Sequence, residues 1–182
     1  YKAYLANYPL GGDFTSRLNN YLRETMGWTY GADSWFSADK YSGNFTISTG
    51  IRAGSTDSAL VAMVDQVKQY NKTGPTAEEV AFMKKAIGQG NALKYETDFQ
   101  KASFLYRMLD YNLSPNYLDQ QAAILKNITA PQLKAIANKV LPIDKMNIVL
   151  VGDKARILPD LKKHGYEIIE LNTDGDAVKP AN

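Results

Sequence analysis

Residues 10–30 read LGGDFTSRLNNYLRETMGWTY, and the pattern of this stretch changes from helical to extended partway along. From residue 15 to residue 26 the apolar side chains recur at helical spacing, at Leu18, Tyr21, Leu22 and Met26. Gly27 is a suitable end for this helix, because glycine adopts the left-handed conformation that often follows a last helical turn. The stretch therefore predicts a helix, a sharp turn and the start of a strand.

The sequence after Gly27 predicts an antiparallel hairpin. Alternate positions carry Trp28, Tyr30, Ala32, Ser34 and Phe36, and a second alternating run carries Phe45, Ile47, Thr49 and Ile51. Between the two runs, residues 39–43 are turn-like. Residues 1–10, ahead of the quoted stretch, are apolar and predict a further helix.

Most of the remaining chain predicts helices. One opens at Thr56 or Asp57, and the next opens at a capping box formed by Thr76 and Glu79. A helix from Asp98 is expected to carry four residues on one face: Phe99, Ala102, Tyr106 and Leu109. Further helices are expected at 117–126, after a cap at Thr129 with Gln132, and at 157–163. Apolar runs at 146–151 and 166–171 predict two late strands.

This order predicts an α+β domain in which helices pack on one face of a mainly antiparallel sheet. We expect one domain over residues 1–171 and a polar tail or linker over 172–182. The chain of 182 residues is long enough for one buried core.

Composition excludes several classes of function. The formal net charge is +2, from 21 basic and 19 acidic residues that are scattered along the chain, which argues against a nucleic-acid partner. The absence of cysteine excludes disulfides, thiolate metal sites and cysteine nucleophiles. No apolar run approaches the roughly 20 residues of a membrane-spanning helix.

The residues for an independent catalytic centre are also missing. His164 is the single histidine, whereas a catalytic zinc commonly takes three protein ligands. We expect His164 to be an exposed residue at a helix end. Glu78 and Glu79 lie in a capping segment, and the Gly11-Gly12 pair is expected to form a tight turn. No metal or other cofactor is therefore expected to bind this chain.

Four segments resemble the second homologous domain of pitrilysin-like zinc metallopeptidases. Residues 10–30 contain L-G-G, S-R-L, L-R-E and G-x-T-Y in the family's order. Residues 43–45, 74–79 and 146–153 are similar to the family's second hairpin strand, a helix-opening motif and a late strand that ends in V-G-D. The resemblance runs from about Asn7 to Leu171.

This resemblance implies a LuxS/processing-peptidase-like metallohydrolase fold whose first strand is missing, since Tyr1 already lies in a helix. It also implies the non-catalytic half of a bacterial zinc metalloendopeptidase that is inactive in isolation. The expected partners are a peptide substrate and a zinc-bearing homologous domain or subunit. An Arg and a Tyr of the family's zinc-free domain reach the substrate, and they match Arg23 and Tyr30 here.

Such a pair suits peptide hydrolysis, because a tetrahedral oxyanion is stabilised by donors held close to it. From spacing alone, the alternative is a surface Arg and a core Tyr. Arg17 is expected to anchor the helix to the sheet. A catalytically silent structural or peptide-binding module of the same fold is the alternative function. By analogy with the family, the expected location is the bacterial cell envelope or periplasm, with the cytoplasm as the alternative.

Overall fold

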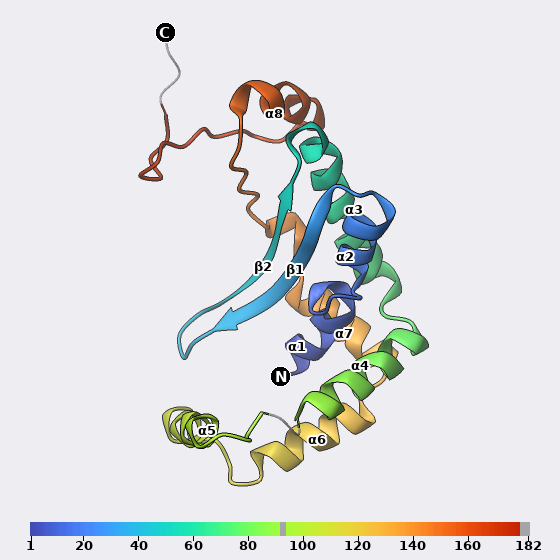
Figure 1. Cartoon of the computed structure of the whole chain (residues 1–182), viewed down its shortest axis with the longest axis vertical. Helices are drawn as coiled ribbons and strands as arrows, with labels where there is room; N and C mark the ends of the chain where they lie inside the picture. Colours follow the sequence, from blue (N-terminus) through green and yellow to red (C-terminus); the bar gives the residue numbers. More distant parts are fainter. Residues whose placement is uncertain (92–93, 179–182) are drawn as a thin grey trace.

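An antiparallel β-hairpin forms the centre of the fold. The computed structural model describes residues 1–91 and 94–178, in which β1 (Thr29–Ala38) and β2 (Gly43–Ile51) form a two-stranded sheet (Figure 1). The register pairs Trp35 with Thr46 and Phe36 with Phe45. The predicted hairpin is confirmed, and its turn occupies residues 39–42.

Helices supply the rest of the architecture, which confirms the predicted α+β class. In chain order they are α1 (Lys2–Gly11), α2 (Arg17–Asn19), η1 (Asn20–Thr25), α3 (Thr56–Thr73), α4 (Ala77–Asn91), α5 (Asp98–Asp110), α6 (Tyr117–Asn127), α7 (Ala130–Val140) and α8 (Lys154–Leu161). Short 3₁₀ turns lie at η2 (Ala53–Ser55), η3 (Ile143–Lys145) and η4 (Lys162–His164). α1 packs against β1, α4 and α7, so that helices cover one side of the hairpin (Figure 1).

Both predicted capping boxes are present at the starts of their helices. The Thr76 amide donates to Glu79 Oε2 at 2.7 Å, and the Glu79 amide donates to Thr76 Oγ1 at 3.2 Å. Thr129 and Gln132 make the same reciprocal pair at the start of α7. Each box satisfies backbone N–H groups that the first helical turn leaves without a partner.

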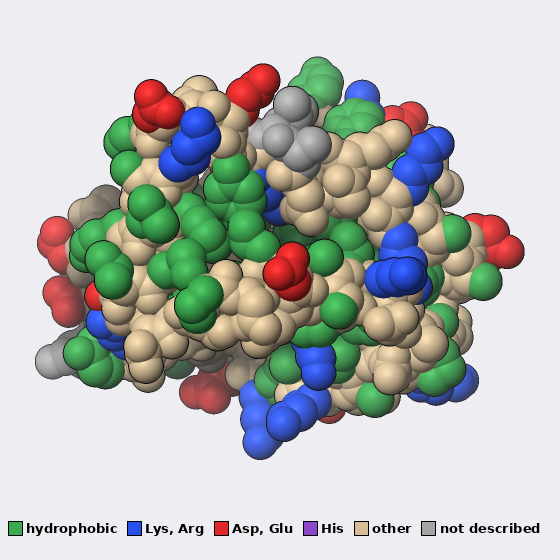
Figure 2. Space-filling view, turned by 90° about the horizontal axis from the view of Figure 1, so that it is seen from below, with side chains coloured by type: hydrophobic (Ala, Val, Ile, Leu, Met, Phe, Trp, Pro, Cys, Tyr) green, Lys and Arg blue, Asp and Glu red, His purple; other side chains and the backbone are tan. Residues whose placement is uncertain are grey.

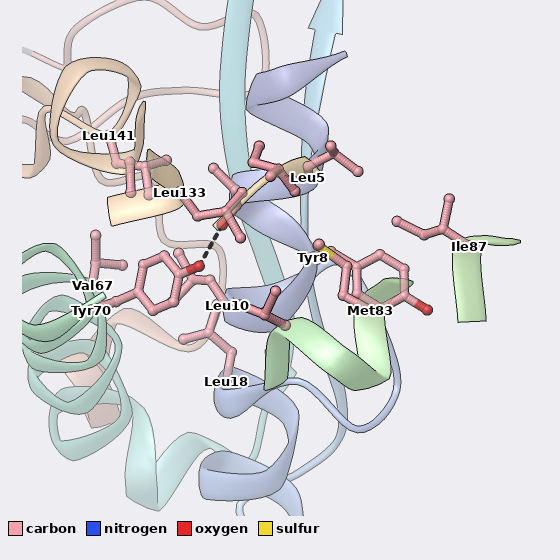
Figure 3. Packing of buried hydrophobic residues seen from close by; sticks show 14 of the residues in the cluster. Leu5, Tyr8, Leu10, Leu18, Val67, Tyr70, Met83, Ile87, Leu133 and Leu141 are labelled. Atoms are coloured by element: carbon pink, nitrogen blue, oxygen red, sulfur yellow. Dashed lines mark hydrogen bonds between the residues drawn. The ribbon is translucent and has the colours of Figure 1, made fainter. Parts of the chain in front are cut away.

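The core is built around α1, which is buried on all sides over its second half. Residues 5–11 are all buried, so this helix has no solvent-exposed face there. Fully buried side chains from four helices surround it: Leu18, Tyr70, Met83 and Leu133 (Figure 3). The Tyr70 hydroxyl donates to the Ala6 carbonyl at 2.6 Å, which gives this buried polar atom a partner.

Two buried side chains join α1 directly to β1. Asn7 Nδ2 donates to the Ser34 carbonyl at 2.7 Å, and Ser34 Oγ donates to Asn7 Oδ1 at 2.6 Å. Gly11 lies on the same side of α1, and a Cβ at this position would be 2.2 Å from Ser34 Oγ. The helix can therefore approach the strand this closely only because residue 11 has no side chain.

The two predicted late strands are wrong for the structure described. Residues 146–151 and 166–170 form no ladder, and Leu171 makes only an isolated bridge with Ala177. Val149 is 76% exposed and Val151 is 97% exposed. Their apolar pattern is suited to a strand, but a strand forms only where a neighbouring backbone supplies hydrogen bonds, and in the described part of the chain neither segment pairs with the hairpin.

The predicted helix from Asp98 is confirmed as α5, but its apolar face is not buried in the described structure. No residue of α5 is buried, and Phe99, Tyr106 and Leu109 are exposed. The helix lies away from the core, near the tip of the hairpin, where Lys40 Nζ is 2.6 Å from Asp110 Oδ1. Figure 2 shows this side of the molecule, and hydrophobic side chains gather over its left half, on the side where α5 lies in Figure 1. The amphipathic pattern predicted the helix correctly, but such a pattern does not show whether another element packs on the apolar face.

Arg17 joins two helices and does not anchor a helix to the sheet as predicted. Its Nε and Nη2 donate to the two carboxylate oxygens of Glu79 at 2.6 and 2.7 Å, and Nη2 also donates to the Gly74 carbonyl at 3.0 Å. The guanidinium also lies 5.1 Å from the centre of the Tyr70 ring. Arg17 therefore ties α2 to the start of α4.

We predict that Gly11→Ala destabilises the protein by roughly 1–3 kcal/mol, because the new methyl group would overlap Ser34 Oγ and approach Leu18 Cδ1 to 2.8 Å. Chemical denaturation measures the change. Gly50→Ala on β2 is the matched control, since a Cβ there meets no atom within 4 Å. Equal stability of the two variants would contradict the close packing of α1 on β1.

We also predict that Arg17→Ala costs about 2 kcal/mol of unfolding free energy, because it removes two charge-assisted hydrogen bonds in a partly buried pair. Lys163→Ala, which breaks the exposed pair with Asp160, should change stability by less than about 1 kcal/mol. Thermal unfolding compares the two variants. A loss in Arg17→Ala no larger than in Lys163→Ala would show that the Glu79 pair contributes little.

Candidate functional site

Arg23 lies in the last turn of the helical segment that precedes β1. Its side chain is 33% exposed, and Nη1 donates to Glu24 Oε1 at 2.5 Å. The guanidinium carbon lies 4.4 Å from the centre of the Phe14 ring, which is within the range of a cation–π contact. A guanidinium has five N–H donors, so one bond to Glu24 leaves donors for a ligand.

The helix that carries Arg23 is not the single α-helix predicted over residues 15–26. Three α-helical residues in α2 are followed directly by the π-helical turn η1. The Met26 amide donates to the Tyr21 carbonyl at 3.0 Å, five residues back. A π-helical turn holds one more residue than an α-helical turn, so it changes the direction in which the following side chains point.

Tyr30 lies at the start of β1 and is 98% exposed. Regular alternation would place it on the buried face with Ala32 and Ser34. The register changes at this point, because β1 advances from Thr29 to Ala32 while β2 moves only from Ile51 to Thr49. The extra residue forms a bulge, and a bulge redirects the side chains beside it. The alternative of a core tyrosine is therefore wrong.

Threonine side chains hold this bulge in place. Thr29 Oγ1 accepts from the Gly31 amide at 3.1 Å, and Thr49 Oγ1 donates to the Gly31 carbonyl at 2.9 Å. The two threonine hydroxyls are 3.0 Å apart. The polar groups of Gly31 that the bulge removes from the regular ladder thus have partners across the hairpin.

Gly27 makes the turn between the two candidate residues, as predicted. Its φ is +61°, a left-handed conformation that glycine adopts without a Cβ clash. The Gly27 amide donates to the Arg23 carbonyl at 3.1 Å, and the Trp28 amide donates to the Leu22 carbonyl at 3.0 Å. The chain therefore reverses immediately after Arg23, and η1 packs beside β1.

A buried asparagine connects the two parts of this surface. Asn19 Nδ2 donates to the Phe14 carbonyl at 2.5 Å, and Asn19 Oδ1 accepts from the Ala32 amide at 3.0 Å. One side chain thus fixes both the residue under the Arg23 guanidinium and the strand just after Tyr30. Asn19 is a positioning residue.

Arg23 and Tyr30 therefore lie on the surface of adjacent segments, and neither is enclosed in the core. Among the residues that the structure describes, no hydrogen bond joins the two side chains. Their convergence on one substrate atom stays a prediction.

This chain does not form a zinc site in the part that the structure describes. Within residues 1–91 and 94–178, no three His, Asp or Glu side chains lie close enough together to hold a metal ion. His164 is an exposed residue in η4, as predicted, and its Nε2 lies 3.7 Å from Asp57 Oδ2. Glu79 is occupied by Arg17 and the Thr76 cap.

The tight turn predicted at Gly11-Gly12 begins one residue later, because Gly11 is the last residue of α1, and the turn carries Asp13. Asp13 Oδ1 accepts from the Thr15 amide at 2.9 Å and from its hydroxyl at 2.7 Å, and Asp13 Oδ2 accepts from the Tyr8 hydroxyl at 2.8 Å. Burial raises the pKa of Asp13, but these hydrogen bonds outweigh it and hold the pKa below its usual value. An ionised carboxylate here repels phosphate.

A concave surface lies away from Arg23 and Tyr30. It is a shallow depression of about 540 Å³ along α5, lined by residues that include Tyr106, Arg107 and Tyr111.

Among the described helices, none is long and apolar enough to cross a membrane.

Sequence reasoning missed two kinds of residue at this surface. Phe14 and Asn19 act through contacts that cross a turn, and no local pattern marks such contacts. Asp33 and Trp35 occupy the outward positions of β1, which the alternation could have identified once the inward positions were assigned.

Comparisons with known proteins relate the first half of the chain to a known family. Residues 1–87 match the family model described as the peptidase M16 inactive domain. No significant match was found among curated proteins.

The chain is similar to several solved structures. A crystal structure of a peptidase M16 inactive domain from Pseudomonas fluorescens superposes with a TM-score of 0.74 and 32% sequence identity, over 79% of this chain and 34% of that one. A candidate zinc protease from Bordetella pertussis has a TM-score of 0.62 and 14% identity, over 77% of each chain. The periplasmic protease PqqL from Escherichia coli has a TM-score of 0.63 and 15% identity, over 77% of this chain and 16% of that one.

The last two likenesses, at 14% and 15% identity, show a shared fold. This chain spans about a third of the Pseudomonas fluorescens protein. The motifs of residues 10–30 and 74–79 both lie within the region of the family match. Residues 1–87 therefore match the peptidase M16 inactive domain, and the likeness at 32% identity extends over 79% of this chain.

Proposed function

We propose that this chain is the non-catalytic half of a bacterial zinc metallopeptidase, and that it presents Arg23 and Tyr30 to a peptide bound at the zinc site of a partner domain. The observation that carries the proposal is that both side chains are held at the surface by specific local structure. A π-helical turn and Phe14 position Arg23, and a bulge positions Tyr30. Neither arrangement is needed for the core, because neither side chain is buried.

The chemistry of the two groups fits the stabilisation of an oxyanion. The Arg23 guanidinium supplies fixed positive charge, and the Tyr30 hydroxyl supplies a neutral donor. Both bind a negatively charged tetrahedral oxygen more strongly than the planar carbonyl from which it forms, so their effect is larger in the transition state. In a partner domain, zinc would activate a water molecule for attack on the peptide.

Glu24 and Phe14 set the position of Arg23 before substrate arrives. The carboxylate of Glu24 and the ring of Phe14 restrict the guanidinium, which lowers the entropy cost of ordering it around a substrate. Because Glu24 is exposed, its screened attraction is weak enough for the guanidinium to turn towards a stronger anion.

A catalytically silent peptide-binding module is the second candidate. It is favoured by the hairpin edges, since no third strand pairs with β1 or β2 in the part of the chain that the structure describes. An extended peptide binds such an edge through main-chain hydrogen bonds. In that case binding would not depend on Arg23 or Tyr30.

A cleavage assay with the zinc-bearing partner domain tests the proposal. We expect Arg23→Ala and Tyr30→Phe each to lower kcat/KM for an unstructured peptide by about 100-fold, with most of the loss in kcat, because each removes an oxyanion donor. Steady-state kinetics with the zinc-loaded protein measures both parameters.

Matched controls come from residues of the same type elsewhere on the surface. Tyr41→Phe at the hairpin turn and Arg107→Ala on α5 remove an exposed hydroxyl and an exposed guanidinium, and both should leave kcat/KM unchanged. Full activity of Arg23→Ala and Tyr30→Phe would show that the oxyanion role is wrong.

We further propose that the protein works in the bacterial cell envelope or periplasm, with the cytoplasm as the alternative. The support is the fold shared with a protease described as periplasmic. Fractionation of the native cells should recover the protein with periplasmic markers, and recovery with cytoplasmic markers alone would contradict this location.

A further inference from the structure

The face of the hairpin opposite the helices carries an unusual pair of side chains. On β1, Ala32 and Ser34 point towards α1 and are buried, so the intervening Asp33 and the next outward residue, Trp35, point away from it. Trp35 is 43% exposed. Trp28, by contrast, packs against the core. The Trp35 indole is therefore available on an open sheet face.

Asp33 gives this face its charge. It is the only charged residue in β1 and β2, whose other outward positions carry neutral side chains. Among the described residues, no Lys, Arg or His pairs with Asp33, whereas Asp110 near the hairpin tip is paired with Lys40 and Asp39 in the hairpin turn accepts from the Tyr41 and Ser42 amides. The outer face of the sheet thus combines one unpaired carboxylate with one exposed indole.

We propose that Asp33 and Trp35 form a subsite for a cationic peptide side chain, Lys or Arg, in the substrate of the peptidase. The proposal rests on the function proposed above and adds a substrate class to it. Two residues on one face of a strand are about 7 Å apart along it. An extended Lys or Arg side chain can therefore place its charge by the carboxylate and its stem or cation over the indole.

Both contacts favour a cation over other side chains. The carboxylate attracts positive charge and repels negative charge, and the face of an indole ring attracts a cation through its quadrupole. An apolar peptide side chain would gain only the indole contact, and an acidic one would be repelled by Asp33. Asp33 and Trp35 therefore discriminate among peptide side chains mainly by charge.

The strand sets where this side chain lies relative to the bond that is cut. Asp33 follows Tyr30 by three positions, but the bulge between Thr29 and Ala32 adds one residue, so the advance along the sheet is about 7–10 Å. An extended peptide advances by about 3.4 Å per residue. The preferred cation should therefore occur two to three residues from the scissile bond, on one side of it.

A positional scan tests the subsite in the intact zinc-loaded peptidase. The substrates are neutral peptides of one sequence that carry a single Lys, Glu or Ala at successive positions around the cleaved bond. We expect kcat/KM to be about tenfold higher for Lys than for Ala at one position two to three residues from the bond, and lower for Glu there. A flat profile would overturn the proposal.

Three variants test whether the preference for Lys arises from Asp33 and Trp35. Asp33→Asn should reduce the Lys-to-Ala ratio to near one, Asp33→Lys should invert the preference to Glu, and Trp35→Leu should weaken it. Asp65→Asn on α3, an exposed acid on the helical side, is the control and should leave the ratio unchanged. An unchanged ratio in Asp33→Asn would assign the preference to other residues.

Binding separates this subsite from the oxyanion role. In the metal-free protein, fluorescence anisotropy of a labelled Lys peptide should show weaker binding for Asp33→Asn and unchanged binding for the Asp65→Asn control. If Arg23→Ala keeps full activity while Asp33→Asn still loses Lys selectivity, the oxyanion proposal fails and the subsite stands. Equal binding of Lys and Glu peptides would reject the subsite whatever the result with Arg23.

Discussion

The reciprocal pair of hydrogen bonds between Asn7 and Ser34 is the contact on which the rest of the fold depends. It joins the most buried helix to the sheet with both side-chain partners hidden from water. Each bond contributes only about 1 kcal/mol net, but loss of one partner leaves a buried polar atom unsatisfied, which costs about 1–3 kcal/mol. Gly11 permits the approach that brings the partners together. Register and helix position are therefore fixed by the same contact.

The candidate site depends on that contact through Asn19. Ser34 sets the position of β1 against α1, and Asn19 then binds the Ala32 amide two residues earlier on the same strand. Its amide nitrogen binds the Phe14 carbonyl, whose ring lies against Arg23. A chain of buried polar bonds thus leads from the core to the surface. The strand that carries Tyr30 and the loop under Arg23 are placed by one rigid element, so their relative position does not depend on the mobility of either side chain.

Elements with a complete local signal could be predicted from the sequence, and those that depend on distant partners could not. The capping boxes at Thr76 and Thr129 need only four consecutive residues, and both are present. The segment 146–151 has the composition of a strand, but a strand also needs a neighbouring backbone to pair with. α5 has an apolar face that is not buried in the described part of the chain. At the site, the motif around Arg23 and Tyr30 identified the residues, while the bulge and the Phe14 contact that orient them required the structure.

The residues that hold this domain together differ from those proposed to contact a ligand. Asn7, Asn19 and Ser34 are buried and hydrogen-bonded, whereas Tyr30 and Asp33 are exposed. Substitution of Tyr30 or Asp33 should therefore change little of the folding free energy, since surface positions without special contacts usually alter it by less than about 0.5 kcal/mol. An exposed aromatic or charged side chain contributes little to the fold, and the proposed binding of a peptide would account for its presence on this surface.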